Sequence, residues 1–444
     1  MRKRISPEYV FNLPKDLKEV SYDGKILIIS PNTAKWIVLN NYDQLSFLHL
    51  LRNEITLQQA LEVFDGSKDD ARVVVTQLVA RQLEETNVQS CVNDETKQLH
   101  FYLTNKCNLR CPHCYMLSGE PTENELTTDE VIGVLKSFAK YGGKSVTLSG
   151  GEIALRPDLI VIIRSAHDLG LKIRLLTNGV LWGENHISEV SCLIDSVQVS
   201  VDGYSEESNQ IVRGKGNFKK ALNTISSFIS HGVTTELGLT PTYYLSGKDD
   251  SSEYVEFCRE LLDKYPKHLF KIKIAEEIIE GREVSPTEGQ SRDYNKYIHK
   301  IKSALNGHSS ELESFVRAFG KDVVMDNCMY GVFSVDSKGD VFFCARVSSL
   351  KPIGNIKNMP FSEIIRLSKV AQEKSKIDNF MPCKECELKY ICGGGCRIDS
   401  FSEFANITDV ENVDFSKISP RKCSQADKER FYRLMIDANE KLFK

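Results

Sequence analysis

Ten of the thirteen cysteines in this chain fall into two groups whose spacing is typical of metal-binding thiolates. The first group follows the pattern C-x3-C-x2-C directly after a strand-like run, and it comprises Cys107, Cys111 and Cys114. The second group lies near the C-terminus and comprises Cys328, Cys344, Cys383, Cys386, Cys392, Cys396 and Cys423. Clustered thiolates hold redox metal, so the metal that they bind decides the chemistry of the chain.

The first group favours a 4Fe–4S cluster over zinc. Three thiolates bind three irons of such a cluster and leave the fourth iron open, which lets the cluster react with a bound molecule. The alternative is a zinc site with His113 as its fourth ligand. Structural zinc usually takes its ligands in pairs from two separate turns, whereas His113 lies between two of the cysteines.

The cysteine pattern, with the aromatic Tyr115 after its last cysteine, resembles the radical S-adenosylmethionine (SAM) superfamily. The resemblance implies that Cys107, Cys111 and Cys114 are the catalytic cluster ligands, and that the open iron chelates the amino and carboxylate groups of SAM. It also implies cleavage of SAM to methionine and a 5′-deoxyadenosyl radical, which takes a hydrogen atom from the substrate.

Polar segments follow the cysteine loop in the order that this family shows. Two glycines let a backbone approach a ligand closely, and a carboxylate can receive an ammonium group. Each segment alone is a common turn signal, but their shared order argues against coincidence. The resemblance implies that SAM is bound by Tyr115, Gly150, Gly151, Glu152, Thr177, Asn178, Ser200, Asp202 and Arg213, with Arg213 near its carboxylate.

Strand-like runs alternate with helical patterns through the middle of the chain. Helices are predicted at 129–141, 156–169, 217–230 and 252–265, and further strands at 234–240 and 268–275. About six β/α units predict a parallel sheet with right-handed crossovers. Resemblance to the family makes this α/β fold a partial (β/α)6 barrel, and the polar segments end its strands, where parallel sheets build their sites.

Seven C-terminal cysteines exceed what one zinc ion takes. Their pattern resembles the SPASM extension of radical SAM enzymes, which carries two auxiliary 4Fe–4S clusters and brings the expected total to three. By resemblance, one auxiliary cluster is held by Cys383, Cys386, Cys392 and Cys423, and the other by Cys328, Cys344 and Cys396. Because these ligands interleave along the chain, we expect the segment to fold only around its metal.

Two positions depart from the family pattern. Some relatives have an eighth cysteine where this chain has Asp322, so the first auxiliary cluster is closed by Asp322, by Asp326 or by a substrate thiolate, or it keeps an open iron. The sulfatase-activating relatives place a catalytic aspartate where this chain has Ala345, which argues against their seryl or cysteinyl oxidation chemistry.

The expected domains are residues 1–94, a radical SAM barrel at 95–310, and a SPASM domain with a C-terminal helix at 311–444. In the first domain the sequence predicts a hairpin about Asp23-Gly24, a third strand at 34–39 and helices at 42–52, 56–64 and 68–83. This order is similar to the winged-helix-like domains that bind leader peptides, in which the leader adds a strand to the sheet edge. We expect that edge along Ala34–Leu39. A winged-helix DNA reader is disfavoured by the net charge of -4.

Composition bounds the remaining choices. No run is long enough to span a membrane, and the N-terminus lacks the apolar stretch of a signal peptide. Free thiols and clusters indicate the reducing cytoplasm. Cys91, Cys192 and Cys258 are predicted to be ordinary buried thiols, and 281–290 a linker or substrate-facing loop.

The sequence therefore predicts a radical SAM maturase of a ribosomally made precursor peptide. Its expected partners are a precursor with a leader and an electron donor such as flavodoxin or ferredoxin, with no nucleic acid and no membrane. The favoured product is a thioether. The alternatives are carbon–carbon cross-linking, modification of a protein partner as in quinone-cofactor or sulfatase maturation, and a non-enzymatic iron–sulfur sensor that binds DNA.

Overall fold

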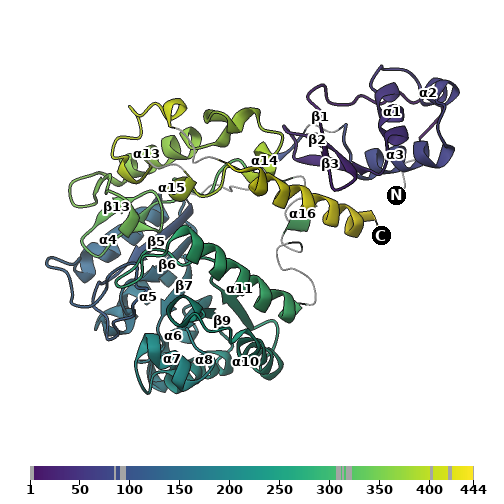
Figure 1. The fold of residues 1–444 in the computed structure, drawn as a ribbon. Coiled ribbons are helices and arrows are strands. Elements are labelled where there is room, and N and C mark those ends of the chain that lie inside the picture. Colours follow the sequence, from purple (N-terminus) through teal and green to yellow (C-terminus); the bar gives the residue numbers. More distant parts are fainter. Residues whose placement is uncertain are drawn as a thin grey trace.

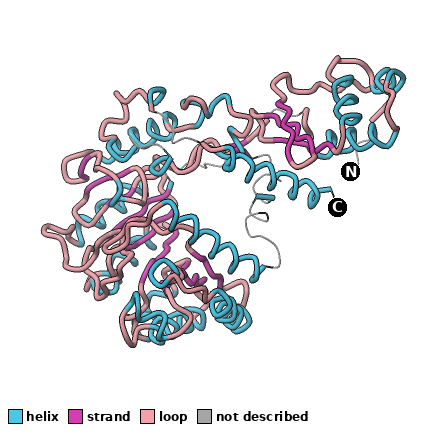
Figure 2. Tube along the Cα trace, viewed as in Figure 1, coloured by secondary structure: helices cyan, strands magenta, loops and turns pink. Residues whose placement is uncertain are grey.

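The computed structural model describes residues 5–84, 87–90, 97–306, 312, 315–316, 323–400, 404–418 and 423–443. Figure 1 shows a small N-terminal unit, a large α/β body and a C-terminal region of short elements that lies between them. In Figure 2 the strands gather in the N-terminal unit and in the α/β body. Within the described residues, no helix combines the length and apolarity needed to cross a bilayer.

The α/β body is built on a sheet whose first six strands run parallel, in the order β10-β9-β8-β7-β6-β5. These strands are β5 (Gln98–Tyr102), β6 (Ser145–Ser149), β7 (Lys172–Thr177), β8 (Ser196–Val201), β9 (Thr234–Leu239) and β10 (Phe270–Ile274). The helices that accompany them are α4 (Thr128–Lys140), α5 (Leu159–Asp168), α6 (Glu184–Ser191), α7 (Glu206–Arg213), α8 (Phe218–Ser230), α9 (Tyr243–Ser246), α10 (Ser251–Lys264) and α11 (Glu288–Asn306). The predicted α/β fold with a mostly parallel sheet is confirmed, whereas α6, α7, α9 and α11 were not predicted.

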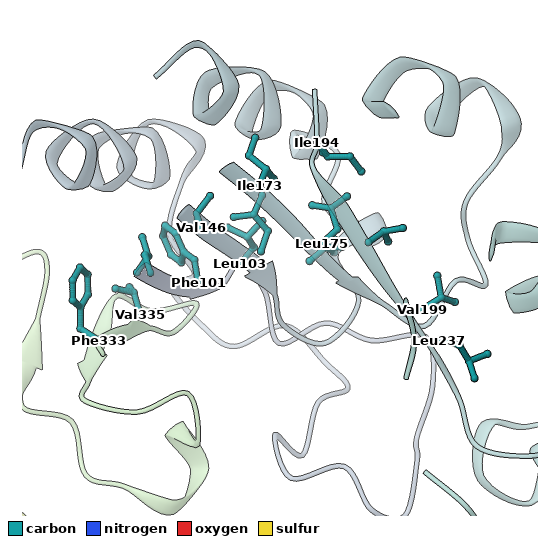
Figure 3. Packing of buried hydrophobic residues seen from close by; sticks show 14 of the residues in the cluster. Phe101, Leu103, Val146, Ile173, Leu175, Ile194, Val199, Leu237, Phe333 and Val335 are labelled. Atoms are coloured by element: carbon teal, nitrogen blue, oxygen red, sulfur yellow. The ribbon is translucent and has the colours of Figure 1, made fainter. Parts of the chain in front are cut away.

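The two faces of this sheet differ in chemistry. One face is apolar and packs against the helices through side chains such as Val146, Leu175 and Leu237, which are buried (Figure 3). Burying a side chain of this size contributes about 1.5–3 kcal/mol. The other face is polar: Arg174 on β7 donates to Gln198 on β8 over 2.9 Å and forms an ion pair with Glu236 on β9.

The sheet continues into the C-terminal region. β12 (Ser334–Val335) pairs in parallel with β5, and β13 (Asp340–Phe342) and β14 (Gly354–Asn355) extend the sheet in antiparallel fashion. The remaining helices of this region are α13 (Phe361–Lys374), α14 (Lys389–Cys392), α15 (Arg397–Ser400) and α16 (Gln425–Phe443), and β11 (Val323–Val324) pairs with β4 (Gln89–Ser90). The two halves that carry the two cysteine groups therefore share one sheet.

The N-terminal unit follows the predicted order of strands and helices. β1 (Lys18–Tyr22), β2 (Lys25–Ser30) and β3 (Lys35–Leu39) form an antiparallel sheet, followed by α1 (Tyr42–Leu51), α2 (Leu57–Val63) and α3 (Lys68–Ala80). Asp23 and Gly24 have φ values of 50° and 69°, and two successive left-handed residues make the tight turn expected of a two-residue hairpin. The comparison of this unit with winged-helix domains stays a prediction.

The outer edge of β3 is already paired with α3. The backbone N–H of Val38 donates to the side-chain oxygen of Gln77 over 2.9 Å, and the Gln77 amide donates back to the Val38 carbonyl over 2.7 Å. Arg81 Nε donates to the Trp36 carbonyl over 3.3 Å. A peptide strand would need these same backbone groups. The predicted strand addition along Ala34–Leu39 stays a prediction, and from this conformation it would require a peptide to displace Gln77.

The C-terminal helix α16 anchors the N-terminal sheet. Trp36 is fully buried, and its Nε1 donates to the carbonyl of Met435 over 3.0 Å. Asn439 Nδ2 donates to Gln77 Oε1 over 3.2 Å, so α16 reaches the residue that pairs with β3. Figure 1 shows α16 extending from the C-terminal region alongside the N-terminal sheet.

The cysteines outside the two groups differ from one another. Cys258 is buried on α10, as predicted, and burial raises the pKa of its thiol to about 12. Cys192 is exposed at the C-terminal end of α6, so its prediction as a buried thiol is wrong. Cys91 lies outside the described residues.

We predict that Trp36→Ala destabilises the junction between the N-terminal sheet and α16. The substitution removes a fully buried ring and its hydrogen bond, a change that costs about 3–5 kcal/mol. Urea denaturation followed by circular dichroism should show a lower midpoint or an earlier separate transition. The matched control is Tyr42→Ala, because that ring is 75% exposed; equal curves for both variants would contradict the anchor.

Candidate active site

Four neighbouring strands bring the predicted catalytic residues to one edge of the sheet. β5, β6, β7 and β8 are adjacent and parallel, so their carboxyl ends meet. The cysteine loop follows β5, and Gly150, Gly151 and Glu152 follow β6. Thr177 ends β7, while Ser200 lies on β8 two residues before Asp202. The structure thus gathers the strand-end residues that the sequence predicted.

The glycine pair after β6 seats the cysteine loop. The N–H of Gly151 donates to the Thr104 carbonyl, and the N–H of Glu152 donates to the Lys106 carbonyl, each over 2.8 Å. A Cβ at Gly150 would lie 2.4 Å from Thr104 O, and one at Gly151 would lie 2.3 Å from Lys106 O. Both distances are far inside van der Waals contact. The two glycines are therefore needed because the cysteine loop itself lies against them. The sequence analysis had explained them by the close approach of a ligand.

Glu152 is a fully buried link between β6 and β7. Its carboxylate accepts from Thr177 Oγ1 over 2.6 Å, from the Asn178 N–H over 2.7 Å and from the Ala154 N–H over 3.1 Å. Burial raises the pKa of Glu152, and these hydrogen bonds oppose that rise. Most of its acceptor capacity is thus used within the protein, and its contact with a SAM ammonium group stays a prediction.

The sulfur of Cys107 is surrounded by N–H donors. The Leu109 N–H points to Cys107 Sγ over 3.4 Å, and Asn178 Nδ2 lies 4.0 Å from the same sulfur while donating to Asn108 Oδ1 over 2.9 Å. Burial raises the pKa of Cys111 to about 11, so this thiol needs a bound metal to lose its proton near neutral pH. Cys107 with these donors, together with Cys111 and Cys114, is a chemically suitable set for an iron–sulfur cluster.

Asp202 and Arg213 form a buried ion pair. Arg213 Nε lies 2.6 Å from Asp202 Oδ2, and both side chains are nearly or fully buried. The backbone of Asp202 is fixed as well, because its carbonyl accepts from Tyr254 OH over 2.7 Å. The structure therefore brings two predicted SAM contacts together. The placement of Arg213 near a SAM carboxylate stays a prediction, and that carboxylate would share the guanidinium with Asp202.

Both ring nitrogens of His113 face partners other than the cysteines. Nδ1 lies 2.7 Å from Tyr244 OH, and Nε2 lies 3.9 Å from Asp202 Oδ2. Burial lowers the pKa of His113. This arrangement disfavours the zinc alternative with His113 as a ligand. Tyr244 was not singled out from the sequence, although its position after the end of β9 was an available signal.

The segment predicted as a linker packs against the cysteine loop. The Glu283 N–H donates to the Pro112 carbonyl over 2.8 Å, and Arg282 donates to the Ser118 carbonyl. A Cβ at Gly281 would lie 2.5 Å from the backbone carbon of His113. The segment is therefore a cover for the loop, and from Glu288 onward it is helix α11.

The division of the C-terminal cysteines into two cluster-binding sets stays a prediction, and the interactions among their thiols agree with it. A hydrogen bond between the thiols of Cys328 and Cys396 lowers the pKa of Cys328 and raises the pKa of Cys396. Burial raises the pKa of Cys344, and the charge of Cys328 adds to this rise. In the other set, burial is the main cause of the raised pKa of Cys383, and the charges of Cys392 and Cys423 add to it. The fourth member, Cys386, has its thiol pKa raised by burial to about 11.

Of the two aspartates considered as closing ligands, Asp326 is buried, and Asp322 lies outside the described residues. Across the part of the chain that the structure describes, no three His, Cys, Asp or Glu side chains are placed to hold a single metal ion.

Comparison with known proteins identifies the class. Residues 101–261 match the radical SAM superfamily, and residues 327–387 match SPASM, an iron–sulfur cluster-binding domain. The chain carries a radical SAM domain followed by a SPASM domain, and it belongs to the radical SAM/SPASM enzymes. Because members of this family are enzymes, the alternative of a non-enzymatic sensor is disfavoured. The family includes peptide-modifying maturases as well as other enzymes.

Three relatives show the range of this group. The AdoMet-dependent heme synthase of Methanosarcina barkeri is 27% identical over 70% of this chain and 93% of that protein. The sporulation killing factor maturation protein SkfB of Bacillus subtilis is 33% identical over 35% of this chain, which spans 38% of SkfB. The PqqA peptide cyclase of Bradyrhizobium diazoefficiens is 25% identical over 70% of this chain and 83% of the cyclase.

A solved structure, native anSMEcpe with bound AdoMet and Cp18Cys peptide, matches 77% of this chain and 99% of that chain with a TM-score of 0.54. The sequence identity is 22%, so this match shows a shared fold alone.

We predict that Gly151→Ala disables the site by displacing the cysteine loop. Its Cβ would meet a backbone oxygen, and overpacking of this kind costs about 1–3 kcal/mol. Formation of 5′-deoxyadenosine, measured with dithionite as reductant, should fall by about tenfold or more. Gly133→Ala is the matched control, because nothing lies within 4 Å of a Cβ at that position. Similar yields from both variants would contradict the seating role.

Proposed function

We propose that this enzyme matures a ribosomally made precursor peptide by installing a cross-link, using SAM and three 4Fe–4S clusters. The observation that carries the proposal is a hydrogen-bonded bridge between the two cysteine groups. Tyr115, which follows Cys114, has its OH 3.2 Å from Tyr102 OH, and Tyr102 OH donates to the carbonyl of Ala345, which follows Cys344. When bound, the clusters and SAM supply a hydrogen-abstracting radical and an acceptor for the electron that cross-linking releases.

The chain's own residues support a substrate held near the polar face of the sheet. Parallel sheets are usually covered on both faces and rich in apolar residues. Here Arg174, Glu236 and Lys271 form a chain of ion pairs across β7, β9 and β10, and the Lys271 side chain is 60% exposed. An accessible polar face suits a peptide backbone with its many donors and acceptors. The named peptide substrate of the PqqA cyclase and the peptide seen with anSMEcpe agree with this class of substrate.

We place the enzyme in the cytoplasm, because iron–sulfur clusters and free thiols need reducing conditions. Its electron donor would be a small carrier such as flavodoxin or ferredoxin.

The N-terminal unit, residues 1–94, would recognise the leader of the precursor. Because α3 closes the β3 edge, the leader would bind elsewhere on this unit or displace Gln77. The heme synthase relatives raise a small-molecule substrate as the second candidate. The separate N-terminal unit, anchored through α16, favours a macromolecular one.

The favoured product is a thioether. Cys328, Cys344 and Cys396 supply three thiolates, and a substrate thiolate is a suitable further donor for iron. Ala345 supplies no acid beside this set. In the competing arrangement Asp322 or Asp326 closes the set, and the product is a carbon–carbon cross-link.

We predict about twelve irons per chain after reconstitution, the content of three 4Fe–4S clusters. Changing Cys107, Cys111 and Cys114 together to alanine should leave about eight irons and abolish 5′-deoxyadenosine, because the auxiliary cysteines are separate from the barrel loop. Iron analysis and chromatography measure the two results. An iron content of about four in the unchanged protein would refute the three-cluster assignment.

We predict that a precursor cysteine loses its reactivity toward iodoacetamide when the thioether forms. The substrate is the product of a neighbouring small open reading frame, and mass spectrometry counts alkylated cysteines before and after turnover. A loss of two hydrogens accompanies either kind of cross-link, so alkylation is the deciding readout. A leaderless core peptide serves as the control and should stay unmodified. If every cysteine still reacts although two hydrogens are lost, the product is not a thioether.

A further inference from the structure

Arg397 is a buried cation in the middle of the C-terminal cysteines. It directly follows Cys396, and its side chain is fully buried. The guanidinium donates to the carbonyls of Gly393 and Gly395, each over 2.9 Å, and to the carbonyl of Ser375 over 2.8 Å. A buried cation of this kind is stabilised by negative charge that lies close to it.

The position of Arg397 relates it to both auxiliary sets. Gly393 follows Cys392 of one set, and Gly395 precedes Cys396 of the other, so the guanidinium binds the short segment that joins them. The backbone N–H of Arg397 also donates to Cys328 Sγ over 3.2 Å. Burial lowers the pKa of Arg397, and the charges of Cys328, Cys383, Cys392 and Cys396, which come from both predicted sets, oppose this lowering.

The backbone around Arg397 is shaped to accept it. Gly393, Gly394 and Gly395 have φ values of 62°, 75° and 68°, a left-handed run that residues with a Cβ strongly disfavour. A Cβ at Gly394 would lie 2.3 Å from Ile377 Cδ1 and 3.1 Å from Arg397 Nη1. The three glycines therefore allow the segment between Cys392 and Cys396 to curl around the guanidinium.

We propose that Arg397 is a positioning residue that acts as the shared counter-charge of the two auxiliary cysteine sets and raises the reduction potential of the clusters they hold. The proposal rests on the cluster assignment made above, but not on the identity of the substrate. A 4Fe–4S cluster with thiolate ligands is an anion, and it gains one more negative charge when it takes up an electron. A fixed cation in a poorly solvated interior stabilises the reduced form more than the oxidised form.

The test compares Arg397→Met, which keeps an unbranched stem but loses the charge, with Arg397→Lys, which keeps the charge. Both are made together with Cys107, Cys111 and Cys114→Ala, so that only the auxiliary clusters contribute to the signal. The midpoint potential is measured by dithionite titration followed by electron paramagnetic resonance, after iron analysis. The control is Arg366→Met, because Arg366 is a surface residue of α13 whose partners, Glu363 and Glu411, lie outside the cysteine sets.

The methionine variant should retain about eight irons and show a more negative midpoint. The lysine variant should stay close to the parent, and the Arg366 variant should equal it. A methionine variant with full iron and an unchanged midpoint overturns the proposal. If the methionine variant loses iron, the lysine variant decides: full iron with the parent's midpoint supports a charge effect, and loss of iron there as well shows that Arg397 is only a scaffold. A parent without auxiliary iron instead refutes the cluster assignment, and a failed peptide assay leaves this result untouched.

Discussion

β5 is paired along both of its edges, and the position of every proposed cofactor site depends on that pairing. On one edge it pairs with β6, whose glycine turn seats the cysteine loop, and on the other with β12, which leads into the C-terminal cysteines. The loop between Tyr102 and Cys114 thus starts from a strand that cannot shift in either direction without breaking hydrogen bonds to a neighbour. Tyr102 ends β5, and its bond to the Ala345 carbonyl fixes the two cysteine groups relative to each other.

Buried charge is the second constraint, and the chain handles it differently in its two halves. In the α/β body Asp202 pairs with Arg213, and Glu152 accepts three hydrogen bonds. In the C-terminal region Arg397 is held by backbone carbonyls close to the cysteine sets, and burial raises the pKa of Cys383 and Cys392. Metal binding turns these thiols into thiolates and so places further negative charge near the guanidinium. Metal binding and folding should therefore be strongly coupled in this region and less so in the α/β body.

Features with a local sequence signal were predicted well. The cysteine spacing, the strand-end residues after β6, β7 and β8, and the Asp23-Gly24 hairpin each depend on a few consecutive residues. The pairing of β5 with β12 was not predictable, because β12 has two residues and its partner lies more than two hundred positions away. The positions of Gly150 and Gly151 were predicted correctly, but their role was attributed to contact with a ligand. Only the structure shows that the backbone from Thr104 to Lys106 fills the space beside them. Arg397 carried no signal beyond its place after a cysteine, and its burial became visible only in three dimensions.

The N-terminal unit shows why an exposed edge cannot be inferred from strand order alone. The sequence correctly predicts that β3 is the last strand of its sheet, and a last strand normally offers free backbone groups. Gln77 removes that option, because a side-chain amide has the same donor and acceptor as a peptide group and pairs with Val38 as a strand would. α16 then contacts Gln77 through Asn439, so the closed edge is coupled to the helix that follows the last cysteine. A peptide that displaced Gln77 from β3 would also disturb α16. Recognition at this edge and the arrangement of the auxiliary cysteines would then be linked by direct contact.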